Sequence, residues 1–167
     1  MRRLSAAGDG QIMQHRFIVK TTQKAILLDS RSQGEKNMGL QERQHIERIQ
    51  TDVIPANNKS LHEATGGEMI FDPDWSTFQN SVDACLNLSS FLTKVIGAVQ
   101  WVARTPVGKQ ALAEGINRIV VRNISDPAEK AMTLKDKIFQ IDLVLSSFAD
   151  EGRFGDSDLI SFLENNL

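Results

Sequence analysis

The stretch that decides the fold is residues 72–104, DPDWSTFQNSVDACLNLSSFLTKVIGAVQWVAR. It opens with the signals of a helix N-terminus, because the acidic Asp72 is followed by a proline at a position where no amide donor is needed. No further proline occurs before Pro106, which again follows a capping residue, Thr105. We therefore predict one long, apolar-rich helix over Asp72–Arg104 as the backbone of the domain.

Apolar residues on this predicted helix form two adjacent rows. The first row holds Phe78, Val82, Cys85, Leu92, Ile96, Val99 and Ala103, and the second holds Ala84, Leu88, Phe91, Val95, Ala98 and Val102. Together the rows cover an arc of about 200°, whereas a helix packed on one side needs little more than about 100°. We expect the helix to be covered on two sides, either by this chain alone or, along its second row, by a partner.

Shorter elements are predicted on both sides of the long helix. Upstream, the pattern indicates a helix from residue 40 that Pro55 stops. A short helix follows, with a capping box at Ser60–Glu63 and a left-handed residue at Gly66-Gly67 that ends it. A strand is then predicted over Glu68–Phe71. Downstream, it indicates a helix over Pro106–Glu114, a strand over Arg118–Ile124, a hairpin of Met132–Leu134 and Ile138–Leu145, and a last helix from Asp156 or Ser157. Strands joined by short turns favour antiparallel pairing. The prediction is an α+β fold in which a small antiparallel sheet of three to four strands packs against the long central helix, with shorter helices at both ends.

Residues 1–37 differ from the rest in their charge. They hold seven Lys and Arg against three Asp and Glu, a net of +4, so the remainder carries −6 of the chain's total of −2. We expect a basic N-terminal tail over residues 1–37, disordered or weakly structured, and a single α+β domain over residues 38–167. Within the tail, Arg16–Lys20 and Lys24–Asp29 are weak strand candidates. A targeting extension and a stretch read from a misassigned start codon are the alternatives for the tail.

Composition argues against several classes of protein. The acidic balance disfavours a nucleic-acid binder, which would show a basic footprint. No apolar run reaches the roughly 18 residues of a membrane span. Cys85 is the single cysteine, so an intramolecular disulfide and a multi-cysteine zinc site are excluded. We expect a soluble cytoplasmic protein without a cofactor, bound to neither membrane nor nucleic acid.

Charged residues supply the first candidates for a ligand site. Glu68, Asp72 and Asp74 are three carboxylates within seven residues, which suits a hard divalent cation, although a strand end before a helix start explains them more simply. Their spacing matches no calcium loop, so we predict no metal. Arg118 and Arg122 alternate on one face of a predicted strand. Two guanidinium groups placed in this way suit a carboxylate or phosphate, and a solvated sheet face is the plainer interpretation.

Three further residues have side chains whose chemistry could serve a function. His62 lies inside the predicted capping box, but a lone histidine without a partner is weak ground for a site. Trp101 falls on the polar side of the long helix, so it is either covered by the helix that begins at Pro106, which we favour, or offered to a partner. Cys85 lies within an apolar row, which predicts an inert buried thiol.

No motif in the chain names a reaction, so the sequence favours a non-enzymatic role in protein interaction or self-association. A protein partner or a second copy would then use the second apolar row and Trp101. The alternative is a small ligand-binding or anion-binding domain, or an enzyme, with a site near Glu68–Asp74 and Arg118/Arg122 and with His62 as a further member.

Overall fold

The computed structural model describes residues 39–79, 81–146 and 152–167, so the expected tail over residues 1–37 lies outside it. The helices are α2 (Leu40–Arg48), α3 (Ile54–Thr65), α4 (Val82–Val102), α5 (Pro106–Gly115) and α6 (Asp156–Asn166). The strands are β1 (Ile70–Phe71), β2 (Arg118–Asn123), β3 (Ala131–Lys135) and β4 (Ile138–Leu143). Three short helical segments complete the described chain: a π-helix at Ile49–Val53, and 3₁₀ turns at Trp75–Phe78 and Pro127–Glu129.

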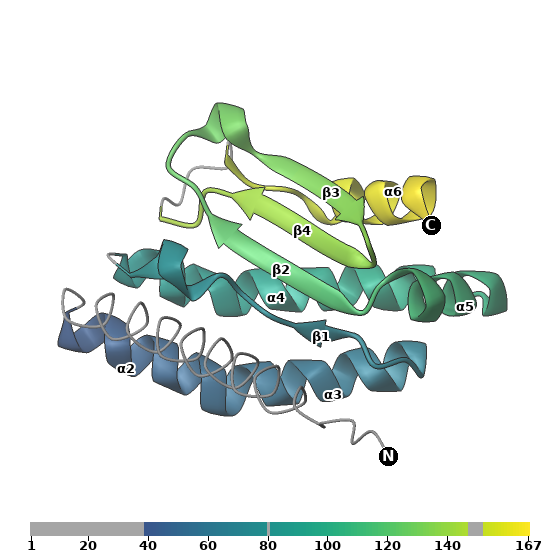
Figure 1. Ribbon diagram of the computed structural model, residues 1–167, viewed down its shortest axis with the longest axis horizontal. Helices are drawn as coiled ribbons and strands as arrows, with labels where there is room; N and C mark the ends of the chain where they lie inside the picture. The colour runs from purple at the N-terminus through teal and green to yellow at the C-terminus, as the bar shows by residue number, and fades with distance from the viewer. Residues whose placement is uncertain (1–38, 80, 147–151) are drawn as a thin grey trace, which may run out of the picture. The chain divides into compact units, whose positions relative to one another are not determined.

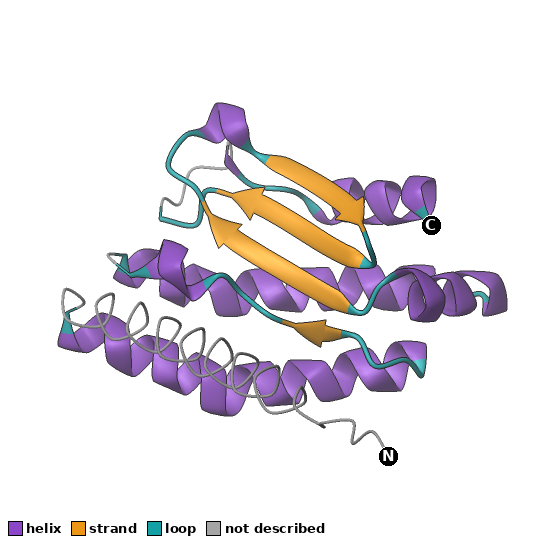
Figure 2. Cartoon of the chain, in the orientation of Figure 1, coloured by secondary structure: helices purple, strands orange, loops and turns teal. Residues whose placement is uncertain are grey.

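The strands form one four-stranded sheet in the order β1-β2-β4-β3, and α4 and α6 pack against one of its faces (Figures 1 and 2). Alternate residues of the two central strands supply the buried side of the sheet, namely Ile119, Val121, Phe139, Ile141 and Leu143. The Phe139 ring stacks on Phe162 of α6 with centroids 5.2 Å apart. The α+β class and the long helix against a small sheet are confirmed.

The strand pairing differs from the prediction, because the sheet is mixed. β2 runs parallel to both β1 and β4, and only β3 and β4 are antiparallel. The hairpin docks on β2 through its second strand, so β4 lies in the centre. Every second residue of β4 is buried, whereas no residue of β3 is fully buried. The more apolar strand therefore takes the position that needs two neighbours, and the shorter one remains at the edge.

A two-residue turn joins β3 to β4. Both turn residues have positive φ, 52° at Asp136 and 63° at Lys137, as a type I′ turn requires. This turn twists in the same sense as the strands, and it places Lys135 directly opposite Ile138.

The helix before the sheet is not stopped by Pro55, contrary to the prediction. Helical structure runs from α2 through the π-helix at Ile49–Val53 into α3, and Pro55 lies in the first turn of α3. A π turn interrupts the regular hydrogen-bond ladder, which accommodates a residue without an N–H. The predicted capping box is also absent, because Ser60 Oγ donates to the Ala56 carbonyl within the helix at 3.2 Å. Gly66, with φ of 71°, ends α3 as predicted.

The long helix begins ten residues later than predicted, at Val82. The amides of Asp72 and Asp74 instead donate to the Ile119 and Val121 carbonyls at 2.9 and 3.0 Å, so this segment continues along β2. Asp74 then caps the 3₁₀ turn, and Ser81 caps α4 by accepting from the Ala84 amide at 3.1 Å. An Asp-Pro-Asp sequence fits a strand end as well as a helix start, which explains the error.

Both apolar rows of α4 are covered by the described chain itself. The buried residues are Ala84, Cys85, Leu88, Phe91, Leu92, Val95, Ile96, Ala98, Val99 and Val102. The helix contacts α2, α3, α5 and α6 as well as the sheet. By length and composition α4 is also apolar enough to cross a membrane. Its position in the core accounts for that composition, and no second chain is needed to cover the second row.

The start of α4 gives a stability prediction. Replacing Ser81 with Ala leaves a helix-terminal amide without its acceptor, so we expect the free energy of unfolding in urea to fall by about 1 kcal/mol. Ser90→Ala, on the exposed middle of the same helix, is the control and should leave stability unchanged or slightly higher. A larger loss from Asp72→Ala than from Ser81→Ala would contradict this assignment of the helix start.

Candidate functional site

The candidate site lies on the face of the sheet opposite the α4–α6 layer. Residues of β2 and β4 that alternate with the buried ones point to this face: Arg118, Val120 and Arg122 on β2, and Ile138, Gln140 and Asp142 on β4. All six are exposed or half-buried. In the described part of the chain no helix covers this open face (Figure 2). Arg118 and Arg122 thus lie on the solvent side of the sheet, as their alternation predicts.

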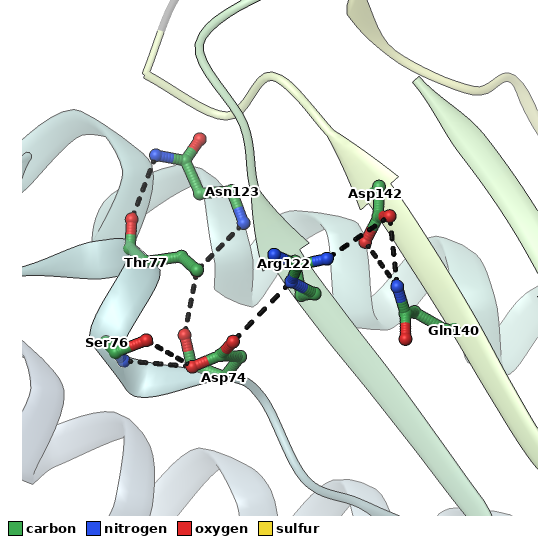
Figure 3. A network of polar contacts seen from close by, with 7 residues as sticks. All are labelled: Asp74, Ser76, Thr77, Arg122, Asn123, Gln140 and Asp142. Carbon is green, nitrogen blue, oxygen red and sulfur yellow. Dashed lines mark hydrogen bonds and ion pairs between the residues drawn. The ribbon is translucent and has the colours of Figure 1, made fainter. Parts of the chain in front are cut away.

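Arg122 is the centre of a polar array on the open face (Figure 3). Its Nε lies 3.5 Å from Asp74 Oδ2, and its Nη1 lies 3.6 Å from Asp142 Oδ2. On the far side of Asp142, the Gln140 amide donates to both carboxylate oxygens at 3.1 and 3.0 Å. One guanidinium therefore bridges two carboxylates from two different chain segments.

Arg118 extends the array towards the other end of β2. Its Nη1 donates to Asp72 Oδ2 at 3.3 Å. The parallel pairing of β1 with β2 places Ile70 opposite Arg118, so the segment that continues from β1 brings Asp72 and Asp74 to the same side as the arginines. We call Asp72, Asp74, Arg118, Arg122, Gln140 and Asp142 the open-face array.

A hydrogen-bond network fixes Asp74 in place (Figure 3). Asp74 Oδ1 accepts from the Ser76 amide at 3.2 Å and from the Ser76 hydroxyl at 2.6 Å. The Thr77 hydroxyl donates to the Asp74 carbonyl at 2.7 Å and accepts from the backbone amide of Asn123 at 3.0 Å. Asn123 Oδ1 in turn accepts from the Leu145 amide at 2.9 Å. The 3₁₀ turn, the end of β2 and the segment after β4 are thus joined, so Asp74 is held by contacts within the domain.

The charges of the array decide which ligands it suits. Two arginines face three carboxylates, so the array carries a net charge of about −1 at neutral pH. A phosphate or carboxylate would have to displace Asp72 or Asp74 from its arginine. A cation is no better served, since no group of three or more His, Cys, Asp or Glu among the described residues is arranged to hold a metal ion. Glu68 is exposed in the segment before β1, outside the array. Fixed charges of alternating sign suit the complementary side chains of a macromolecule.

The two remaining candidates lie on other elements. His62, on the last turn of α3, has its Nδ1 2.9 Å from the Gly67 carbonyl and helps to close the end of that helix. Trp101, near the end of α4, stays 47% exposed, and the group over its ring is the Arg104 guanidinium at 4.0 Å from the centroid. The expected cover by α5 is therefore wrong. Among the described residues, no hydrogen bond or ion pair joins His62 or Trp101 to the array.

Gln140 and Asp142 are the members of the array that the sequence did not single out. Their alternation with Phe139 and Ile141 does place them on the polar side of a strand. The sequence did not reveal that Asp142 pairs with Arg122, because the register that sets these two residues opposite each other exists only when β4 pairs with β2. The alternative site did group Asp72 and Asp74 with the arginines, but the expected helix start at Asp72 hid the path along β2 that brings them together.

Cys85 is buried, with its Sγ 3.8 Å from the Phe78 carbonyl. Burial, and after it the negative charge of Glu42, raises the pKa of the thiol from its ordinary value of 9.0 to about 11. The thiolate is the reactive form, so the group is inert at neutral pH.

The raised pKa of Cys85 predicts both slow thiol chemistry and a pH effect. We expect Ellman's reagent to react slowly with the native protein at pH 7 and quickly after unfolding in urea. The unfolded thiol ionises first, so stability contributed by the neutral buried form is complete below pH 9 and is lost as the pH rises towards 11. The Cys85→Ala variant should not show this loss of stability between pH 9 and pH 11. Fast labelling of the native thiol would show that Cys85 is accessible.

The array predicts unequal costs for its two arginines. Arg122→Met leaves Asp74 and the mostly buried Asp142 without their shared cation, so we expect a loss of about 1 kcal/mol in urea unfolding. Arg118→Met removes a single exposed pair and should cost less than about 0.5 kcal/mol. The Arg122 effect should also shrink in high salt. Equal losses for the two variants would contradict a central role for Arg122.

Comparison of the chain with protein-family models, with curated proteins and with solved structures found no match in any of the three. The function is therefore inferred from the contacts of the open-face array and its surroundings.

Proposed function

We propose that the domain is a non-enzymatic protein-interaction module whose partner binds the open face of the sheet. The observation that carries the proposal is the one-sided covering of the sheet: α4 and α6 pack on one face, and the other presents the open-face array. A helix whose apolar arc is already buried offers less to a partner than this face does.

The side chains across the open face support a macromolecular partner. The strand register places Ile70, Arg118, Ile138 and Lys135 in one row, and Val120, Gln140 and Thr133 in the next. Ile70 is 46% exposed, and Val120 and Ile138 are half-buried. Apolar side chains set among paired charges are the composition of a protein interface, in which polar groups set specificity and apolar ones supply contact area.

The alternative, a small ligand-binding or anion-binding domain, has one observation in its favour. Asp72 and Asp74 do lie beside Arg118 and Arg122, which brings the two candidate groups together. Both guanidinium groups already have carboxylate partners, however, and the array has a net negative charge. A rise in melting temperature with inorganic phosphate that Arg118→Met abolishes would favour this alternative.

The interaction proposal is tested with two matched double variants of the tagged full chain. Ile70→Ser/Arg118→Ser removes an apolar and a cationic side chain from the open face, and Leu86→Ser/Lys94→Ser removes the same pair of types from the exposed side of α4. We expect the wild type and the α4 variant to capture the same protein from the source lysate. The amount captured by the open-face variant should be at least about tenfold lower, which corresponds to about 1.4 kcal/mol.

Equal melting temperatures would confirm that both double variants fold. Equal capture by the two variants would place the binding surface elsewhere. The absence of any captured protein would count against the proposal as well.

A further inference from the structure

The two edges of the sheet differ in whether another element covers them. At the β1 edge, the Phe71 amide points away from β2 and donates to Asn58 Oδ1 of α3 at 2.8 Å, so α3 closes this edge. At the other edge, β3 has no neighbour on its outer side in the described part of the chain (Figure 1). Natural sheets protect such edges with short strands, lysine, proline, bulges or inward-pointing charges. β3 is a five-residue strand with one lysine, Lys135, next to the turn, and its inward-pointing residues are the apolar Met132 and Leu134.

The hairpin register identifies the free backbone groups of β3. Residues that flank a two-residue turn form a hydrogen-bonded pair, so Lys135 bonds to Ile138, and Thr133 and Ala131 bond to β4 in the same way. The N–H and C=O groups of Met132 and Leu134 therefore point outward. These N–H and C=O groups are the donors and acceptors with which a further strand would pair.

We propose that β3 pairs antiparallel with β3 of a second copy of this chain, about a two-fold axis at Thr133. In this register Met132 of each copy faces Leu134 of the other, and each such pair exchanges two backbone hydrogen bonds. Four hydrogen bonds then join the two four-stranded sheets into one sheet of eight strands. The half-buried Met132 and Leu134 side chains also bury further apolar surface.

Charge complementarity selects this register. With the axis at Thr133, the end of β3 that follows Lys130 meets the end of the second copy's β3 that precedes Asp136, so these two opposite charges lie at the same end of the paired strands. Both residues are exposed. Lys130 donates to the Arg153 carbonyl at 3.2 Å, and its ammonium group has two further donors.

The neighbouring registers offer less. An axis at Met132 or at Leu134 shifts Lys130 by two residues relative to Asp136 of the second copy, which separates the two opposite charges. The Thr133 axis also places two β-branched side chains opposite each other on the open face, which is a favourable cross-strand pair.

This pairing does not depend on the proposed function. It uses the backbone edge of β3, whereas the partner proposal uses the open face. A monomer that still binds a partner, or a dimer that binds none, would separate the two.

Register-specific cross-linking tests the pairing. In the full chain, Thr133→Cys places two thiols at a non-hydrogen-bonded pair, where the Cα atoms lie about 4.5 Å apart and a disulfide is within reach. Lys135→Cys is the matched control, because it is exposed on the same face of the same strand, but its two copies lie about 13 Å apart along the strand. The native Cys85 is buried and does not compete. We expect mild oxidation to form the Thr133→Cys dimer at least tenfold faster than the Lys135→Cys dimer.

Sedimentation equilibrium under reducing conditions provides a second readout. The wild-type chain should show twice the mass of a monomer. Leu134→Pro should be monomeric, since it removes an outward N–H and leaves the β3–β4 ladder intact. A monomeric wild type, a dimeric Leu134→Pro variant, or equal cross-linking of the two cysteine variants would each overturn the proposal.

Discussion

The apolar arc of α4 is the constraint on which the rest of the described structure depends. A helix with apolar side chains over more than half of its circumference is stable in water only if it is surrounded. The chain meets this need by placing its other helices and one face of the sheet around α4. With those helices gathered around α4, none of the described ones is left for the second face of the sheet. The exposure of the open-face array is therefore a consequence of how the core is built.

Much of the fold was predictable from local patterns, and much of the candidate site was not. The two apolar rows of α4, the alternation of β4 and the Gly66 end of α3 are each determined by neighbours within a few residues, and all were predicted correctly. The central position of β4 was missed because it depends on a competition between two strands for the place beside β2. The prediction of a helix cap at Asp72 was wrong because the amide partners of Asp72 and Asp74 lie almost fifty residues away along the chain. A site assembled by strand register cannot be recognised before the register is known, which is why the arginines were candidates and Asp142 was not.

The open-face array is made rigid at one end and left accessible at the other. Asp74 is tied through Ser76, Thr77 and Asn123 to three parts of the backbone, whereas the Arg118–Asp72 pair is exposed on both sides. Ordered charges in a partly exposed position contribute little to folding, but they lower the entropic cost of meeting a complementary surface. The same ion pairs that are weak as sources of stability are well suited to selecting one partner over another.

The hydrogen bond from Phe71 to Asn58 would limit the size of any assembly that formed through the edges of this sheet. A sheet with two free edges adds copies at both ends and grows into a fibre, because each addition exposes a new edge like the last. Here Asn58 Oδ1 accepts from the Phe71 N–H, which is the edge group that a further strand would need. A pairing through β3 leaves only the two closed edges at the ends of the joined sheet, so the assembly is finite. Asn58 thus occupies the backbone group that a further strand would need, and the helix that carries it covers the same edge.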